Sequence, residues 1–319
     1  MESKKLIVTA SPHITNHTST RGLMLNVCIA LLPALVASTL IFGARALLVT
    51  GVTVAACVGF EALYCVVMKK PVPVGDFSAV VTGMILAFNL PATIPLWIAI
   101  IGAFVAIVVA KQLFGGLGFN FANPALLGRI VLFIGFAGRM TAYAFPQTDI
   151  DALASATPLV AGNSMAGKDM LLQLLLGAHG GVLGETCAVA LILGGIYLIA
   201  TKTISAAIPL SYIGTVAVLS LVLGQDVVLQ LFSGGLLLGA FFMATDYVTS
   251  PFTLKGKLVY GVALGIVTFA IREWGSYAEG VSFALLFMNL WVPYINDLTR
   301  QTPYGYIKPA KPAKEAAGK

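Results

Sequence analysis

The sequence has 319 residues, of which 58% are hydrophobic and 10% are charged, and its mean hydropathy is +0.94. This composition excludes a soluble globular protein, because one core cannot bury so much apolar surface, and it indicates a polytopic membrane protein. The net charge of +6 is explained below by membrane topology and anionic lipid, so it does not indicate binding of nucleic acid.

Ten apolar segments predict ten transmembrane helices. In chain order they cover residues 22–42, 46–68, 77–90, 92–110, 124–144, 185–201, 205–223, 227–245, 257–272 and 279–296. The third ends at Asn89-Leu90-Pro91, where proline stops the helix. The N-terminus is too polar for a cleavable signal, so we expect the first span to stay in the membrane as an anchor.

Basic residues predict the orientation of these spans. If the N-terminus is cytoplasmic, fourteen lysines and arginines fall on the inner side and four on the outer side, with Arg129 inside a span. The outer four are Arg45, Arg139, Lys168 and Arg272, and the inner group runs from Lys4 and Lys5 to Lys319 and includes Lys111. By the positive-inside rule both termini are expected in the cytoplasm, with the polar segment 139–185 outside.

Two short motifs recur in the two halves of the chain. Gly118-Phe119-Asn120-Phe121-Ala122 has a counterpart in Gly280-Val281-Ser282-Phe283-Ala284, and Thr82-Gly83 before Pro91 has one in Ser233-Gly234 before Pro251. Five spans in each half would invert the second half relative to the first, as in transporter folds. Chance similarity between glycine-rich membrane helices is the alternative.

The expected fold is therefore all-α, with about ten transmembrane helices arranged as two inverted five-helix repeats with broken or re-entrant segments. The whole chain, 1–319, forms one membrane domain. Its parts are a cytoplasmic segment 1–21, a first repeat 22–144, an outer-face loop 145–184, a second repeat 185–296 and a cytoplasmic tail 297–319.

Common redox cofactors have no obvious ligands in this sequence. The four cysteines contain no CxxC pair, and the three histidines, His13, His17 and His179, all lie outside the expected spans. An iron–sulfur cluster held by this chain alone, a haem or a zinc site is therefore not expected. Redox chemistry would need a different cofactor.

Several motifs, in order along the chain, carry a family resemblance. They are Ala10-Ser11-Pro12-His13-Ile14, Ser78-Ala79-Val80-Val81-Thr82-Gly83, the run from Phe114 to Asn120 with Asn123-Pro124-Ala125-Leu126, Ser155-Ala156-Thr157-Pro158-Leu159, and Ala244-Thr245-Asp246-Tyr247-Val248-Thr249-Ser250-Pro251. Together they resemble the RnfD family of membrane subunits of Rnf complexes, to which NqrB of the sodium-pumping NADH:quinone reductase is related. The short N-terminal segment favours the Rnf type.

This resemblance implies a covalent flavin on the outer loop. In the family, FMN is joined through its phosphate to the threonine that closes the motif, here Thr157, by an exported transferase that uses FAD. Asp151, Ser155 and Ala156 belong to the same motif. Ala154 departs from the family pattern, which more often has threonine or serine there. The hydroxyl that accepts FMN is nevertheless present.

The resemblance also implies an assembly in the cytoplasmic membrane of a bacterium or archaeon. Partner subunits, membrane-bound and peripheral, would carry iron–sulfur clusters and flavin, and the complex would couple electron transfer between ferredoxin and NAD to movement of Na⁺ or H⁺. A second, noncovalent flavin such as riboflavin is also expected. Catalysis would belong to the complex and not to this chain alone.

Other polar residues near the membrane are candidate site residues. Asn120 and Asn123 follow a glycine-rich run and are expected in the wall of a flavin or ion site, or simply at a tight helix contact. Asp246 and Thr249 are candidates for an ion path, or for a solvated helix end. Glu61 and Arg129 lie inside apolar spans, where we expect them to pair with each other or to reach the membrane surface.

Two alternative functions remain open from sequence alone. One is an NqrB-like component of a sodium-pumping NADH:quinone reductase. The other is a solute channel or transporter, such as a urea or ammonium carrier, on the same inverted-repeat scaffold with Thr157 unmodified.

Overall fold

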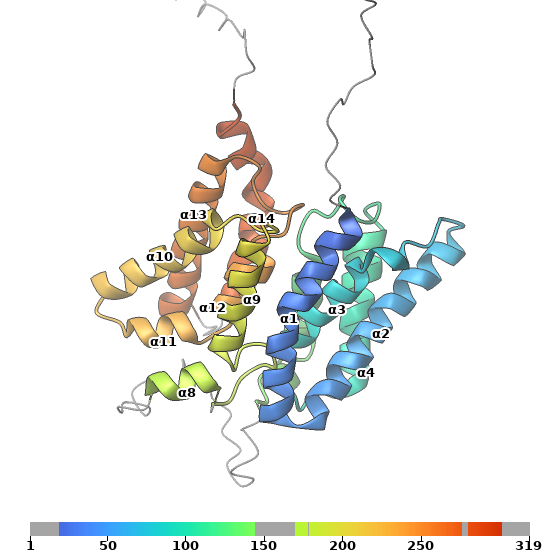
Figure 1. The fold of residues 1–319 in the computed structure, drawn as a ribbon, viewed down its shortest axis with the longest axis horizontal. Coiled ribbons are helices and arrows are strands. Elements are labelled where there is room, and N and C mark those ends of the chain that lie inside the picture. Colours follow the sequence, from blue (N-terminus) through green and yellow to red (C-terminus); the bar gives the residue numbers. More distant parts are fainter. Residues whose placement is uncertain (1–18, 144–169, 178, 276–279, 302–319) are drawn as a thin grey trace, which may run out of the picture.

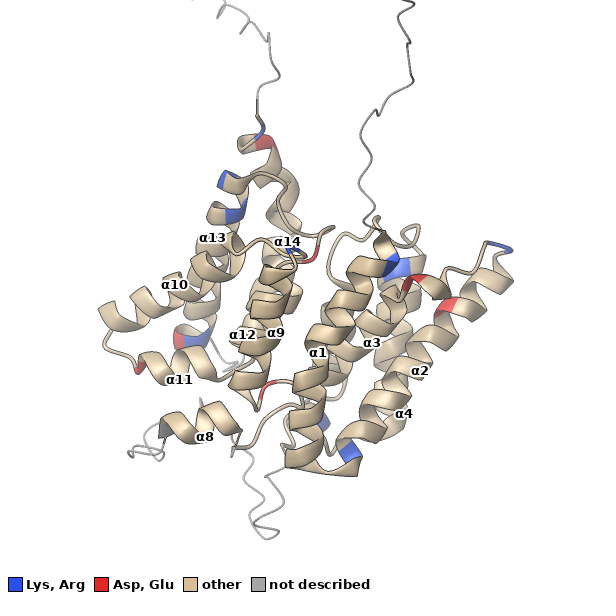
Figure 2. Ribbon diagram, in the orientation of Figure 1, with Lys and Arg blue, Asp and Glu red and all other residues tan. Residues whose placement is uncertain are grey.

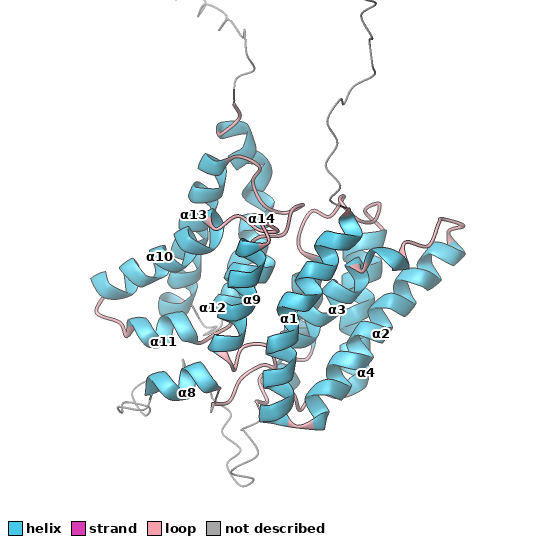
Figure 3. Ribbon diagram, in the orientation of Figure 1, coloured by secondary structure: helices cyan, strands magenta, loops and turns pink. Residues whose placement is uncertain are grey.

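The computed structural model describes residues 19–143, 170–177, 179–275 and 280–301, and the regular elements in these ranges are helices (Figure 3). The first half contains α1 (Thr20–Phe42), α2 (Ala44–Val67), η1 (Val74–Asp76), α3 (Ser78–Phe88), α4 (Leu96–Phe104), the π-helix η2 (Val105–Gln112), α5 (Pro124–Gly135) and α6 (Ala137–Met140). The second half contains α8 (Met170–Leu176), α9 (Ala188–Ala200), α10 (Ala207–Val222), α11 (Val227–Phe232), α12 (Leu236–Leu238), the π-helix η4 (Gly239–Met243), α13 (Leu254–Trp274) and α14 (Val281–Leu298).

Helices lie at the ten expected positions, but they differ in length. Among the described helices, α1, α2, α13 and α14 are long and apolar enough to cross a membrane individually. At 1.5 Å per residue, the 11 residues of α3 cover only about half of the hydrocarbon thickness. The all-helical prediction is confirmed, and ten full-length spans are confirmed only in part.

The eighth expected span, 227–245, is interrupted and not continuous. Between α11 and α12, Gly234 and Gly235 have φ angles of 68° and 69°, a region that residues with a Cβ rarely adopt. Arg272 on α13 donates hydrogen bonds to the carbonyl oxygens of Ser233 (3.0 Å) and Gly234 (3.2 Å). The break is tolerated because neighbouring protein satisfies the exposed backbone groups.

The two halves of the chain pack side by side through two pairs of helices (Figure 1). The helix α1 lies against α9 so closely that a Cβ on Gly194 would be 2.2 Å from the carbonyl oxygen of Ala30. The helix α5 contacts α14, where the rings of Phe133 and Phe283 are 6.0 Å apart in an edge-to-face arrangement. Each pair joins helices that hold the same place in their halves, first with first and last with last.

Basic residues of the described chain gather at one end of the bundle (Figure 2). We call this the basic end: α1 and α13 begin there, with Arg21 in the first turn of α1 and Lys255 and Lys257 at the start of α13. Arg272 lies in the last turn of α13, at the opposite end, near which α8 also lies. The distribution follows the asymmetry expected from the sequence.

Candidate functional site

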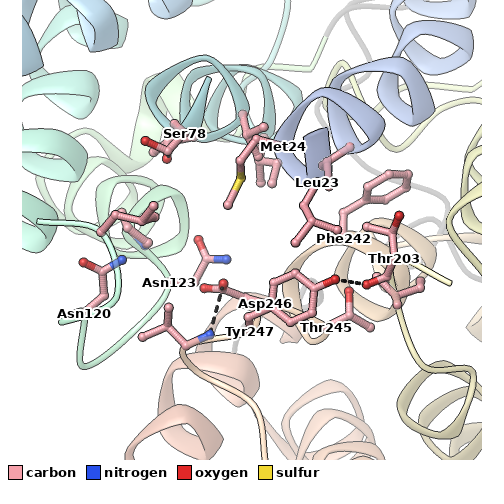
Figure 4. A pocket seen from close by; sticks show the side chains of 18 of the residues that line it. Leu23, Met24, Ser78, Asn120, Asn123, Thr203, Phe242, Thr245, Asp246 and Tyr247 are labelled. Atoms are coloured by element: carbon pink, nitrogen blue, oxygen red, sulfur yellow. Dashed lines mark hydrogen bonds between the residues drawn. The ribbon is translucent and has the colours of Figure 1, made fainter. Parts of the chain in front are cut away.

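A cavity of about 260 Å³ lies between the two halves of the molecule (Figure 4). From the first half, α1, α3, the end of η2 and the loop before α5 line it; from the second half, the end of α9, η4 and the residues after η4 do so. Its polar lining residues are Thr20, Ser78, Thr82, Lys111, Asn120, Asn123, Thr203, Thr245, Asp246 and Tyr247. A mostly apolar cavity with a few polar groups is the usual form of a small-molecule site, and its volume is near the lower end for such sites.

The loop between η2 and α5 brings two predicted site residues into one wall of the cavity. Asn123 caps α5: its Oδ1 accepts hydrogen bonds from the backbone N–H groups of Ala125 (3.1 Å) and Leu126 (3.4 Å), and Pro124 occupies the first helical position. Both features favour a helix start. The Oδ1 of Asn120 is buried and accepts no hydrogen bond from the described protein. The expectation that Asn120 and Asn123 share a site wall agrees with this geometry.

Asp246 reaches the same cavity from the second half, after the end of η4 (Figure 4). Its carboxylate accepts hydrogen bonds from the backbone N–H of Val248 (3.4 Å) and from the hydroxyl of Thr249 (3.2 Å). Burial raises the pKa of the Asp246 carboxyl above its usual value, while these hydrogen bonds act in the opposite direction. Asp246 therefore lines the cavity directly, and Thr249, which is buried beside it, holds its carboxylate.

The expected pairing of Glu61 with Arg129 is wrong. Glu61 forms a buried ion pair with Lys111, with 2.6 Å between Oε1 and Nζ and side-chain exposures of 0% and 2%. The side chain of Gln112 donates a second hydrogen bond to Glu61 Oε1 (2.8 Å). Lys111 was also expected among the charges of the inner surface, but packing of η2 against α2 draws its ammonium into the protein.

Arg129 instead joins the two halves. Its Nη1 donates hydrogen bonds to Asn89 Oδ1 at the end of α3 (2.7 Å) and to Ser282 Oγ at the start of α14 (2.6 Å). A buried guanidinium needs such acceptors because the cost of removing its charge from water is high.

Three cavity residues were missed by the sequence analysis. Lys111 was assigned to the surface, Ser78 was noted only within a motif, and Tyr247, whose hydroxyl donates a hydrogen bond to the carbonyl oxygen of Thr203, carried no recognised signal. The run of small and aliphatic residues up to Ala110 was a usable clue, because a helix that continued through Lys111 would carry that side chain into the bundle.

The residues of the expected covalent flavin site, Asp151, Ser155, Ala156 and Thr157, lie outside the described residues. The neighbouring helices α6 and α8 are described and bound this part of the chain. Of the candidate site residues within the described ranges, Asn120, Asn123, Asp246 and Thr249 come together at the cavity.

Comparison with known proteins supplies the family. Residues 7–305 match the NQR2, RnfD, RnfE family. The chain is 44% identical to the RnfD-type subunit of the Na⁺-translocating ferredoxin:NAD⁺ oxidoreductase complex of Acetobacterium woodii, over 98% of this chain and 100% of that protein. It is 38% identical to the corresponding subunit of the proton-translocating ferredoxin:NAD⁺ oxidoreductase complex of Clostridium ljungdahlii, over 93% and 96%, and 37% identical to that of the ion-translocating oxidoreductase complex of Stutzerimonas stutzeri, over 92% and 95%. The chain belongs to the NQR2, RnfD, RnfE family.

Proposed function

We propose that this chain is the flavin-carrying membrane subunit of an Rnf-type complex, which couples electron transfer between ferredoxin and NAD to cation translocation. The observation that carries this proposal is the 44% identity, over the full length of the relative, to the RnfD-type subunit of such a complex. Relatives of this kind are named for Na⁺ in one case and for protons in another. The proposal therefore specifies a small cation and the assembly, with iron–sulfur and flavin subunits as partners and membrane lipid around the helices.

The proposed covalent cofactor is FMN on Thr157. Support comes from the Ser-Ala-Thr-Pro motif in a polar part of the chain that follows α6 and precedes α8. The helix α8 lies away from the basic end (Figure 1). If the basic end is cytoplasmic, as the positive-inside rule predicts, this part of the chain is accessible to an exported transferase.

We further propose that the halves are inverted repeats of five membrane segments each. The pairs α1 with α9 and α5 with α14 support this, because a two-fold axis brings corresponding helices together. The α5–α14 contact adds a second similarity: Asn123, at the start of α5, lies by its backbone N–H close to Asn289 in α14, and Ser282, at the start of α14, bonds Arg129 in α5. Each helix thus presents its N-terminal residue to a polar side chain farther along the other.

The cavity is the proposed site of a second, noncovalent flavin such as riboflavin. The residues fit a flat ring system: apolar side chains from both halves form most of the lining, and the buried Asn120 Oδ1 remains an unsatisfied acceptor, which a polar ligand or water must complete. When bound, the flavin would supply the electron-transfer chemistry. The residues of this chain would orient it and exclude water.

A flavin assay of the purified complex tests the proposed function. After denaturation and separation, flavin fluorescence should remain on this chain, and acid extraction should release a second flavin. A chain without bound fluorescence and without extractable flavin would contradict the redox assignment and favour a solute transporter on the same scaffold.

Reporter fusions test the proposed orientation. A reporter after Lys319 is expected to be active only in the cytoplasm and one at Gly162 only outside, because fourteen basic residues lie on the inner side of the expected layout and four on the outer side. Alkaline phosphatase and green fluorescent protein activities, compared at both positions, measure this. Opposite labelling would move Thr157 out of reach of an exported transferase.

Asp246→Asn is expected to lower ion transport per electron while leaving covalent flavin and assembly intact. The substitution removes the carboxylate charge at the cavity but keeps size and most hydrogen bonding. Ion uptake into vesicles, driven by reduced ferredoxin and normalised to electron flux, measures the effect. Asp226→Asn is the matched control, because Asp226 caps α11 outside the cavity and asparagine caps equally well. Equal uptake ratios in both variants would remove Asp246 from the ion path.

A further inference from the structure

The side chain of Lys111 has one N–H group that the described protein does not use. An ammonium carries three donors. One is bonded to Glu61 Oε1 and a second to Ser78 Oγ, each at 2.6 Å. Ser78 in turn donates to Asp76 Oδ1 (2.6 Å). Lys111 also lines the cavity, so its remaining N–H is available to a ligand there.

The ion pair is oriented with its positive end toward the cavity. Lys111 and Ser78 line the cavity, whereas Glu61, on α2, does not. The Glu61 carboxylate is anchored by Gln112 as well as by Lys111. A ligand in the cavity is therefore closer to the ammonium than to its counter-ion, and the low dielectric of the surroundings increases this difference.

The two walls of the cavity also differ in polarity. The first half contributes Lys111, Asn120 and Asn123, while the second half contributes the aromatic rings of Phe241 and Phe242. Figure 4 shows Asn120 and Asn123 on one side of the space and Phe242 on the other. A flavin ring has carbonyl oxygens at one end and an apolar dimethylbenzene at the other. This arrangement suits only one orientation, with the carbonyl end toward Lys111.

We propose that Lys111 donates a hydrogen bond to the carbonyl end of the cavity flavin and favours the reduced ring, which carries more negative charge, over the oxidised ring. Glu61 and Ser78 are the positioning residues that hold the ammonium at the cavity wall. This inference rests on the noncovalent flavin of the proposed function. It adds the residue that selects the redox state of that flavin and the orientation of its ring.

The test compares affinities for the two redox states in the purified complex. The variant is E61Q/K111M, which removes both charges together, keeps similar side-chain lengths and leaves Gln112 a carbonyl acceptor at position 61. Riboflavin is removed and added back, oxidised or fully reduced with dithionite, and both dissociation constants are measured. We expect affinity for the reduced form to fall about tenfold relative to the oxidised form, equivalent to a midpoint potential about 30 mV lower for this two-electron couple.

The control is Lys202→Met, which removes an exposed lysine next to the cavity-lining Thr203 without altering the lining itself. Water and salt screen a charge in that position, so the ratio of affinities should stay at the wild-type value. A purely structural ion pair predicts that E61Q/K111M weakens both forms equally or neither, and either result overturns the proposal. If the wild-type complex binds no riboflavin, the cavity ligand of the proposed function itself fails, which is visible before any variant is made.

Discussion

Thr157→Ala is expected to produce an inserted chain, assembled in its complex, with no covalent flavin. The FMN phosphate requires a side-chain hydroxyl, and Thr157 is the residue that closes the Ser-Ala-Thr motif. Intact-mass measurement of the purified chain should show the loss of one FMN adduct, and fluorescence of the denatured chain should disappear.

Ser164→Ala is the matched control for this loss. It removes a hydroxyl from the same polar part of the chain but outside the motif, so the adduct should remain complete. An adduct of unchanged mass on Thr157→Ala would show that another residue carries the flavin. Loss of the adduct from both variants would point to a general defect in insertion or in transferase access.

Breaking the Glu61–Lys111 pair is expected to have the largest effect on stability. Glu61→Gln leaves the Lys111 ammonium buried without its counter-ion, and removing one partner of a buried pair typically costs about 3–5 kcal/mol. The double variant E61Q/K111M removes both charges and should recover most of this loss. Thermal unfolding of the detergent-solubilised chain, read from tryptophan fluorescence, compares the three proteins.

Glu273→Gln provides the control for loss of a carboxylate. Glu273 is exposed on α13 and accepts a hydrogen bond from Gln225 (3.0 Å). Its substitution should change stability by no more than about 0.5 kcal/mol. If the double variant were as unstable as Glu61→Gln, the cost would come from lost packing at the α2–η2 contact and not from an unpaired charge.

Local features of the chain were readable without the fold. Asn123 followed by Pro124 is a helix start that needs only neighbouring backbone groups, and the structure has that cap. Positions of the helices followed from hydropathy, which sums over adjacent residues. The motifs around Thr157 and Asp246 were sufficient for the family, which the comparisons then confirmed.

Helix interruptions were only partly readable. Pro91 announced the end of α3 because proline acts on its own helix. The break at Ser233–Gly235 was hidden in an apolar run, since its stability depends on the guanidinium of Arg272, on a helix that follows later in the chain. A break of this kind is decided by which side chain arrives to satisfy the free carbonyl groups.

The sequence by itself determined the membrane class, the approximate positions of the helices and the family, because each depends on local composition or on motifs of a few residues. Tertiary structure alone decided that Glu61 pairs with Lys111 and that Arg129 bridges Asn89 and Ser282. It also decided that Asn120, Asn123 and Asp246 meet at one cavity. The physical reason is that a buried charge or amide takes the partner brought to it by helix packing, and that partner can lie more than a hundred residues away, as Ser282 does from Arg129.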